Sequence, residues 1–84
     1  MTTISRMPTL EILKPNLTKI ELNDKIGVWF SYETPIAFRV DDTVYISENV
    51  WSQTTGKHLN IIDGGAKAGR LNHAEFQKRI TEIF

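Results

Sequence analysis

Cysteine is absent from this 84-residue chain, so neither a disulfide nor a thiolate metal site can stabilise it. Long apolar runs are absent as well. No segment approaches the roughly 18 apolar residues of a membrane span, and the first residues lack the apolar run of a signal peptide. The sequence therefore predicts a soluble, unexported protein of a reducing cytoplasm, and it offers no cluster of residues that predicts a metal site or a cofactor.

An excess of charge of one sign is also lacking. Ten lysine and arginine residues balance ten aspartate and glutamate residues, which argues against a protein whose affinity comes mainly from neutralising phosphates. From Lys57 onward five basic residues outnumber three acidic ones, and we interpret this mild positive charge as an ordinary mixed surface. The length suits a single domain, 1–84, with one modest core, in which residues 1–8 are expected to be flexible.

Alternation of apolar residues predicts an antiparallel meander of four strands. Every second residue is apolar on both sides of Asn23-Asp24, a pair with the composition of a tight hairpin turn. The alternation recurs after Thr34-Pro35 and again after Asp41-Asp42. The apolar residues that carry it are Ile20, Leu22, Ile26, Val28, Phe30, Tyr32, Ile36, Phe38, Val40, Val44 and Ile46.

The edge strands of this meander are predicted at Leu17–Asn23 and Thr43–Ser47. Before them, Thr9–Lys14 fits the pattern of a strand and also that of a single helical turn, and Pro15 ends either one. A meander of this size leaves its apolar face exposed to water unless another element covers it.

Two helices are expected to supply that cover. Asn72 and Glu75 have the spacing of a capping box, which places the start of the last helix at His73. Its apolar stripe consists of Phe76, Ile80, Ile83 and Phe84. A shorter helix is predicted from about Thr55 to Ile62, before the stop signal Asp63-Gly64-Gly65. The predicted fold class is α+β: an antiparallel four-stranded meander with a short helix and a C-terminal helix packed on one face.

The densest group of polar side chains is Trp51–Asn60, where the shorter helix is expected to begin. A helix start carries unpaired N–H groups and a partial positive charge, so hydroxyls and a lysine gathered there can hold an anion. The candidate contacts are Thr54, Thr55, Lys57 and His58. The alternative is structural, because N-capping explains at least one threonine, and a histidine at a core margin is more often half-buried and hydrogen-bonded than a ligand contact.

Trp29 is a further candidate binding residue. It falls on the opposite strand face from Val28 and Phe30, where it is a partner contact if it is exposed. If Thr9–Lys14 folds over that face, Trp29 belongs instead to a second small core, and the sequence favours neither interpretation. Trp51 is expected to anchor its loop against the sheet rather than to stack on a ligand.

The segments Ser31-Tyr-Glu-Thr-Pro-Ile-Ala-Phe38 and Trp51-Ser-Gln-Thr-Thr-Gly-Lys-His-Leu-Asn60 give the chain a resemblance to small proteins of unknown function encoded mainly by tailed bacteriophages. The likeness covers roughly Ile20 to Asn60 and does not extend to the residues from Ile61 on. It implies a viral accessory protein in the bacterial cytoplasm. It carries over neither an activity nor a catalytic residue.

Three functions compete at this point. The leading hypothesis is a non-enzymatic module that binds a host or viral protein. The alternative is a phosphate- or nucleic-acid-binding module that uses the helix start at 54–58. Four later basic residues are expected to assist it: Lys67, Arg70, Lys78 and Arg79. A catalyst comes third, because paired carboxylates and a nucleophile motif are missing from the sequence. The sequence also leaves open a homodimer formed by pairing of the edge strand Thr43–Ser47.

Overall fold

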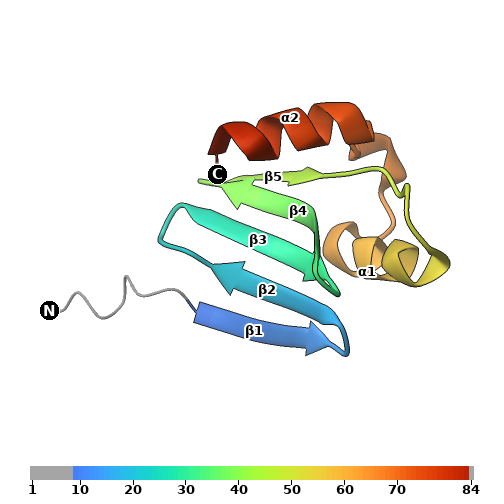
Figure 1. Cartoon of the computed structure of the whole chain (residues 1–84), viewed down its shortest axis with the longest axis horizontal. Helices are drawn as coiled ribbons and strands as arrows, with labels where there is room; N and C mark the ends of the chain where they lie inside the picture. The colour runs from blue at the N-terminus through green and yellow to red at the C-terminus, as the bar shows by residue number, and fades with distance from the viewer. Residues whose placement is uncertain (1–8, 84) are drawn as a thin grey trace, which may run out of the picture. The chain divides into compact units, whose positions relative to one another are not determined.

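The computed structural model describes residues 9–83, and the expectations for residues 1–8 and for Phe84 lie outside that range. Five strands form one sheet in the order β1-β2-β3-β4-β5, followed by helices, so the predicted α+β class is confirmed (Figure 1). The elements are β1 (Thr9–Lys14), β2 (Leu17–Glu21), β3 (Ile26–Ser31), β4 (Thr34–Val40), β5 (Thr43–Ile46), α1 (Gln53–Asp63), the 3-10 helix η2 (Lys67–Gly69) and α2 (His73–Ile83). Two compact units divide between Val44 and Tyr45 and are described separately.

The first unit is an antiparallel meander with one strand more than predicted. Thr9–Lys14, for which strand and helical turn were both open, is strand β1, and Leu10 pairs with Ile20 of β2. Pro15 and Asn16 make the turn, since proline fixes its own φ and Asn16 adopts the left-handed φ of 66° that asparagine tolerates. The prediction that Leu17–Asn23 is an edge strand is therefore wrong. β2 lies between β1 and β3, and β1 is the edge.

The predicted hairpin at Asn23-Asp24 is present between β2 and β3. Asn23 Oδ1 accepts hydrogen bonds from the backbone N–H groups of Lys25 at 2.8 Å and Ile26 at 3.0 Å. Such a bond from a side chain to its own turn is the reason that asparagine favours this position. The pairing of Ile20 with Val28 follows from this turn.

Trp29 lies on the face opposite Val28, as predicted, but it is only 8% exposed. Lys19, its cross-strand partner, places its Nζ atom 4.9 Å from the centroid of the Trp29 ring. The exposed-contact interpretation of Trp29 is therefore not supported. The alternative was a second small core, formed if Thr9–Lys14 folded over the Trp29 face. That premise is wrong too, because β1 extends the sheet beside β2.

Beside Trp29, a charged cluster crosses the same strands. Glu21 accepts from Lys19 Nζ at 2.9 Å and from Arg39 Nη2 at 2.6 Å. Gly27 lies between Glu21 and Arg39 in the register, and a Cβ atom there would meet the Glu21 carboxylate at 3.2 Å. Burial alone would raise the pKa of Glu21, but the bonds from Lys19 and Arg39 outweigh it and lower that pKa below its usual value.

The second unit contains the end of β5 and the helices. α2 begins at His73 as predicted, and Asn72 Oδ1 accepts from the N–H of Glu75 at 2.9 Å, which confirms the predicted cap. Phe76 and Ile80 are buried, in agreement with the predicted stripe. α1 begins two residues earlier than predicted.

The chain after β5 pairs with a later segment of the same unit. The N–H of Leu71 donates to the carbonyl of Ile46, and the N–H of Glu48 donates to the carbonyl of Leu71, each at 2.8 Å. Leu71 thus forms a parallel bridge with Ser47. The C-terminal end of the predicted edge strand Thr43–Ser47 is therefore already paired. The bridge occupies backbone groups that pairing with a second copy in the predicted homodimer would use.

Candidate functional site

The start of α1 is capped by Ser52. Its Oγ accepts from the N–H of Thr55 at 3.2 Å, and its carbonyl accepts from the N–H of Gly56 at 3.0 Å. Neither threonine is the cap, contrary to the structural alternative considered from the sequence. The N–H group of Thr55 is therefore already bonded to the Ser52 hydroxyl and is not available to an anion.

The structure does not gather the five candidate binding residues on one surface. Thr55 and His58 are each 5% exposed, whereas Thr54 and Lys57 are exposed on the same helix. Trp29 is on β3, in the other unit. For His58 the outcome agrees with the core-histidine interpretation. The helix start at 54–58 thus offers a ligand two exposed side chains, Thr54 and Lys57.

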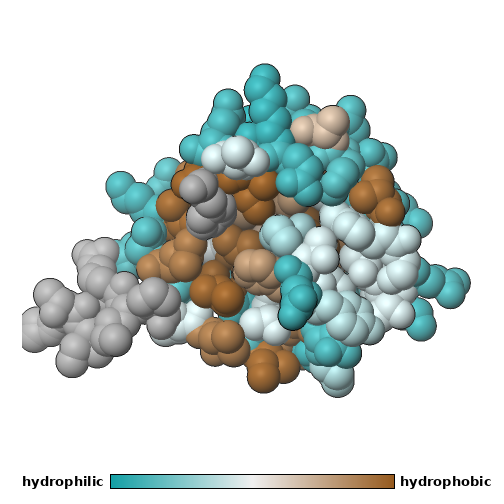
Figure 2. Space-filling model, viewed as in Figure 1, coloured by the Kyte–Doolittle hydropathy of each residue, from teal (hydrophilic) through white to brown (hydrophobic). Residues whose placement is uncertain are grey.

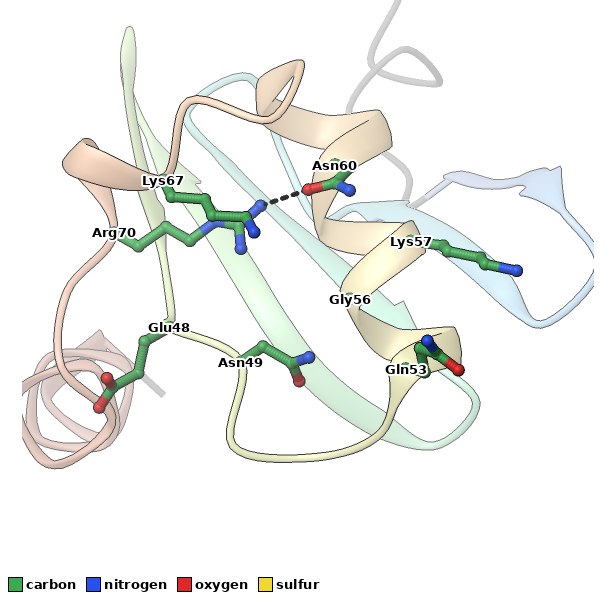
Figure 3. A pocket seen from close by; sticks show the side chains of 8 residues that line it. All are labelled: Glu48, Asn49, Gln53, Gly56, Lys57, Asn60, Lys67 and Arg70. Atoms are coloured by element: carbon green, nitrogen blue, oxygen red, sulfur yellow. Dashed lines mark hydrogen bonds between the residues drawn. The ribbon is translucent and has the colours of Figure 1, made fainter.

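A polar hollow of about 630 Å³ lies beside the exposed side of α1 (Figure 3). We call this site the polar hollow. Its lining consists of Glu48, Asn49, Gln53, Gly56, Lys57, Asn60, Lys67 and Arg70. Figure 3 shows Lys67 and Arg70 extending toward Asn60, while Lys57 points away from them. Of the four candidate contacts at the helix start, Lys57 alone belongs to this lining, together with Lys67 and Arg70, which were expected to assist phosphate binding.

Arg70 is fixed in the wall of the polar hollow. Its Nε donates to Asp63 Oδ2 at 2.8 Å, and its Nη2 donates to Asp63 Oδ1 at 3.1 Å and to Asn60 Oδ1 at 3.0 Å. The side chains of Arg70 and Asp63 are only 6% and 9% exposed. The hydrogen bond from Arg70, with a further one from the N–H of Gly65, lowers the pKa of Asp63 against the opposing effect of burial. The pair thus joins the end of α1 to the residue that follows η2.

Asn49 closes another part of the wall. Its Nδ2 donates to the carbonyl of Ser52 at 3.0 Å, and its Oδ1 accepts from the N–H of Trp51 at 3.0 Å. A Cβ atom on Gly56 would lie 2.9 Å from Asn49 Nδ2. Gly56 therefore permits the close approach of a side chain of its own unit.

This contact makes the effect of Gly56→Ala depend on Asn49. Alanine in a helix is favoured over glycine by about 1 kcal/mol, but here it displaces an amide whose two hydrogen bonds contribute about 0.5–1.5 kcal/mol each. We expect Gly56→Ala to raise the free energy of unfolding by about 1 kcal/mol in an Asn49→Ala background and to give no such gain in the native background. Urea titration of the four proteins measures this difference, and an equal gain in both backgrounds would show that the contact is unimportant.

His73, at the start of α2, contacts the segment between β5 and α1. Its ring lies 5.1 Å from that of Trp51 in an edge-on arrangement, and its Nδ1 lies 3.3 Å from Ser47 Oγ. Glu48 Oε2 accepts from the backbone N–H of His73 at 2.8 Å. Trp51 therefore anchors its loop, and the partner of this contact is the start of α2, whereas the sheet was expected.

In the first unit, β1 presents an exposed apolar edge. Leu10 and Ile12 are 62% and 70% exposed, and both lie on the face that carries Val28. Figure 2 shows hydrophobic surface along the border of the molecule where Figure 1 draws β1. A shallow hollow of about 680 Å³ adjoins it, lined by Ile12, Asn16, Thr18, Tyr32, Glu33 and Thr34. The sequence does not predict this surface, because the pattern of Thr9–Lys14 fits a helical turn as well as a strand.

Residues 9–83 contain neither a group of side chains that could hold a metal ion nor a helix that could span a membrane. Within residues 9–83, no three histidine or acidic side chains lie close enough together to hold a metal ion. No helix in that range is long and apolar enough to cross a membrane.

The chain belongs to the family of unknown function DUF8033, whose pattern matches residues 9–78. This range includes β1 and every residue of the polar hollow. No curated protein and no solved structure matches the chain.

Proposed function

We propose that this protein is a non-enzymatic binding module that holds an extended segment of a partner protein beside β1. The carrying observation is the pair Leu10 and Ile12, two large aliphatic side chains exposed on an edge strand. Natural proteins usually protect such edges with charge, proline or a covering element, because they pair readily with other strands.

The backbone supports this mode of binding. Among residues 9–83, β1 has a strand neighbour on one side only, where it pairs with β2. Alternate N–H and C=O groups of Thr9–Lys14 therefore point away from the sheet. A partner strand would satisfy them in the way that sheet augmentation does in peptide-binding domains.

The side chains add a hydrophobic contribution. The row that begins with Leu10 continues across the sheet through Ile20, Val28 and Phe38. Fully burying a large aliphatic side chain is worth about 1.5–3 kcal/mol, so covering Leu10 and Ile12 would gain roughly 2–4 kcal/mol. The shallow hollow beside Ile12 and Tyr32 provides room for one side chain of the partner.

The resemblance to phage proteins supports a host or viral protein as the partner and the bacterial cytoplasm as the place of action. The alternative, phosphate or nucleic-acid binding through the helix start at 54–58, has less support. Ser52 already occupies the N–H of Thr55, and both Thr55 and His58 are buried.

The proposal predicts a selective effect of Ile12→Arg. The probe is a peptide selected from a random library for binding to the native protein. Arginine at position 12 removes apolar contact and places a charge at the edge, so we expect affinity to fall at least about tenfold, the equivalent of 1.4 kcal/mol. Ile61→Arg is the matched control, because Ile61 is an exposed apolar residue on α1.

Isothermal titration calorimetry measures both affinities, and circular dichroism verifies that both variants are folded. Equal affinities for Ile12→Arg and the native protein would contradict the proposal. So would a loss caused by Ile61→Arg alone. Light scattering distinguishes peptide binding from pairing of β1 with β1 of a second copy.

A further inference from the structure

The polar hollow contains donors that its own unit leaves unused. Arg70 bonds through Nε and Nη2, and its Nη1 makes no hydrogen bond to any residue in the range 9–83. The guanidinium is held by Asp63, and the Arg70 side chain as a whole is only 6% exposed. Its two remaining N–H groups are thus oriented before any ligand arrives, which reduces the entropic cost of binding.

Asn60 helps to hold Arg70 in position. Arginine has no acceptor atoms, so the Asn60 atom that contacts Arg70 at 3.0 Å must be the amide oxygen. The amide NH2 group of Asn60 is consequently left to donate elsewhere. Arg70 therefore fixes the orientation of this amide as well as its own.

Lys67 adds charge to the same end of the hollow. It comes from η2, three residues before Arg70, and its ammonium group has no ion-pair partner within residues 9–83. Figure 3 shows its side chain running toward the same region as that of Arg70. Unlike Arg70, Lys67 has no carboxylate that neutralises it among the described residues.

Glu48 is the carboxylate in the lining, and it faces another way. Its Oε2 accepts from the N–H of His73 at the start of α2, where the helix dipole favours a negative charge. In Figure 3 its side chain points away from Asn60 and Arg70. The end of the hollow formed by Lys67, Arg70 and Asn60 therefore combines net positive charge with N–H donors.

We infer that this end of the polar hollow binds the phosphate group of a small phosphorylated ligand. The guanidinium of Arg70 and the ammonium of Lys67 are both donors, which suits an anion with several oxygens and disfavours a cation. The volume of about 630 Å³ falls within the range of small-molecule sites, roughly 300–1,000 Å³. The hollow belongs to the second unit and β1 to the first, so this inference does not rest on the proposed function.

Titration of the ¹⁵N-labelled protein with inorganic phosphate, and separately with adenosine monophosphate, tests the inference at constant ionic strength. We expect saturable shifts in the backbone amides of 67–70 and in the side-chain amide of Asn60. Loss of one charged contact in Lys67→Gln should weaken binding at least about fivefold, as expected for hydrogen bonds to charged groups. Lys78→Gln, which changes an exposed lysine of α2 outside the lining, should leave binding unchanged.

Tighter binding of adenosine monophosphate than of phosphate would show that the hollow also holds the nucleoside, and equal binding would show that it holds phosphate alone. Both results support the inference. Absence of saturable shifts with both probes would overturn it, as would equal weakening by Lys67→Gln and Lys78→Gln or no weakening by Lys67→Gln. None of these outcomes bears on peptide binding at β1.

Discussion

Phe76→Ala is expected to remove most of the stability of the fold. The Phe76 side chain is completely buried on α2, beside Ile80 in the apolar stripe of that helix. Truncating a buried phenylalanine typically costs about 3–5 kcal/mol, through lost apolar burial and the cavity that remains. Domains of this kind are stable by about 5–15 kcal/mol in total, so the loss is a large fraction of what holds the chain folded.

Asn72→Ala is the matched comparison for Phe76→Ala. It removes the cap at the start of the same helix, where Asn72 accepts from the N–H of Glu75, and such a loss costs about 1 kcal/mol. Urea titrations followed by circular dichroism give both free energies of unfolding. If Phe76→Ala costs no more than Asn72→Ala, the apolar stripe does not contribute to the core.

Asp63→Ala is expected to have the second largest effect, a loss of about 3 kcal/mol at neutral pH. Removing one partner of a buried ion pair leaves the other charge without compensation, which costs about 3–5 kcal/mol. We expect the lower end of that range because Arg70 lines a hollow through which water can reach it. The exposed pair between Glu75 and Arg79, at 2.8 Å, is the control, and Glu75→Gln should cost less than about 1 kcal/mol.

The same pair predicts how stability depends on pH. Because the hydrogen bond from Arg70 lowers the pKa of Asp63 in the folded protein, the contribution of Asp63 is complete above its unfolded pKa, about 3.9. It is lost as pH falls through the folded pKa. Glu21, whose pKa is also lowered, acts in the same direction. Thermal unfolding between pH 6 and about pH 2 should therefore show a smaller loss of stability on acidification for Asp63→Ala than for the native protein. The same dependence of stability on pH in both proteins would show that Asp63 does not contribute in this way.

Local signals in the sequence were sufficient for several elements. The turn at Asn23 and the start of α2 at His73 depend on bonds between a side chain and the backbone two or three residues away. Residue type alone specifies such bonds, so the hairpin and the helix cap follow from the sequence. The alternation of apolar residues likewise specifies which face of β3 carries Val28 and which carries Trp29.

Other features depend on contacts that sequence patterns do not encode. Thr9–Lys14 is too short for its periodicity to distinguish a strand from a helical turn, and its pairing with β2 decides the outcome. The start of α1 was misplaced because Gly56 weakens the helical pattern in the first turn, while Ser52 caps the helix from outside it.

The polar hollow itself was missed for a related reason, although Lys67 and Arg70 were expected to assist phosphate binding. Gly64–Gly69 has the composition of a flexible linker, yet Gly64 and Gly65 adopt left-handed φ values of 66° and 87°, and Lys67–Gly69 forms a 3-10 turn. These conformations bring Arg70 back to Asp63 and Asn60 on α1. An acidic and a basic residue seven positions apart, with three glycines between them, were the available signal, and that spacing alone is too common to be specific.

Amide hydrogen exchange of the protein with and without a selected peptide tests the proposed binding mode most directly. Alternate amides of Thr9–Lys14 face β2, whereas the others face away from the sheet and await a partner strand. Strand addition therefore predicts that the outward-facing amides of β1 gain protection when the peptide binds, and that Ile12→Arg reduces this gain at the same peptide concentration. Protection confined to α1 or α2, with exchange along β1 unchanged, would contradict the account.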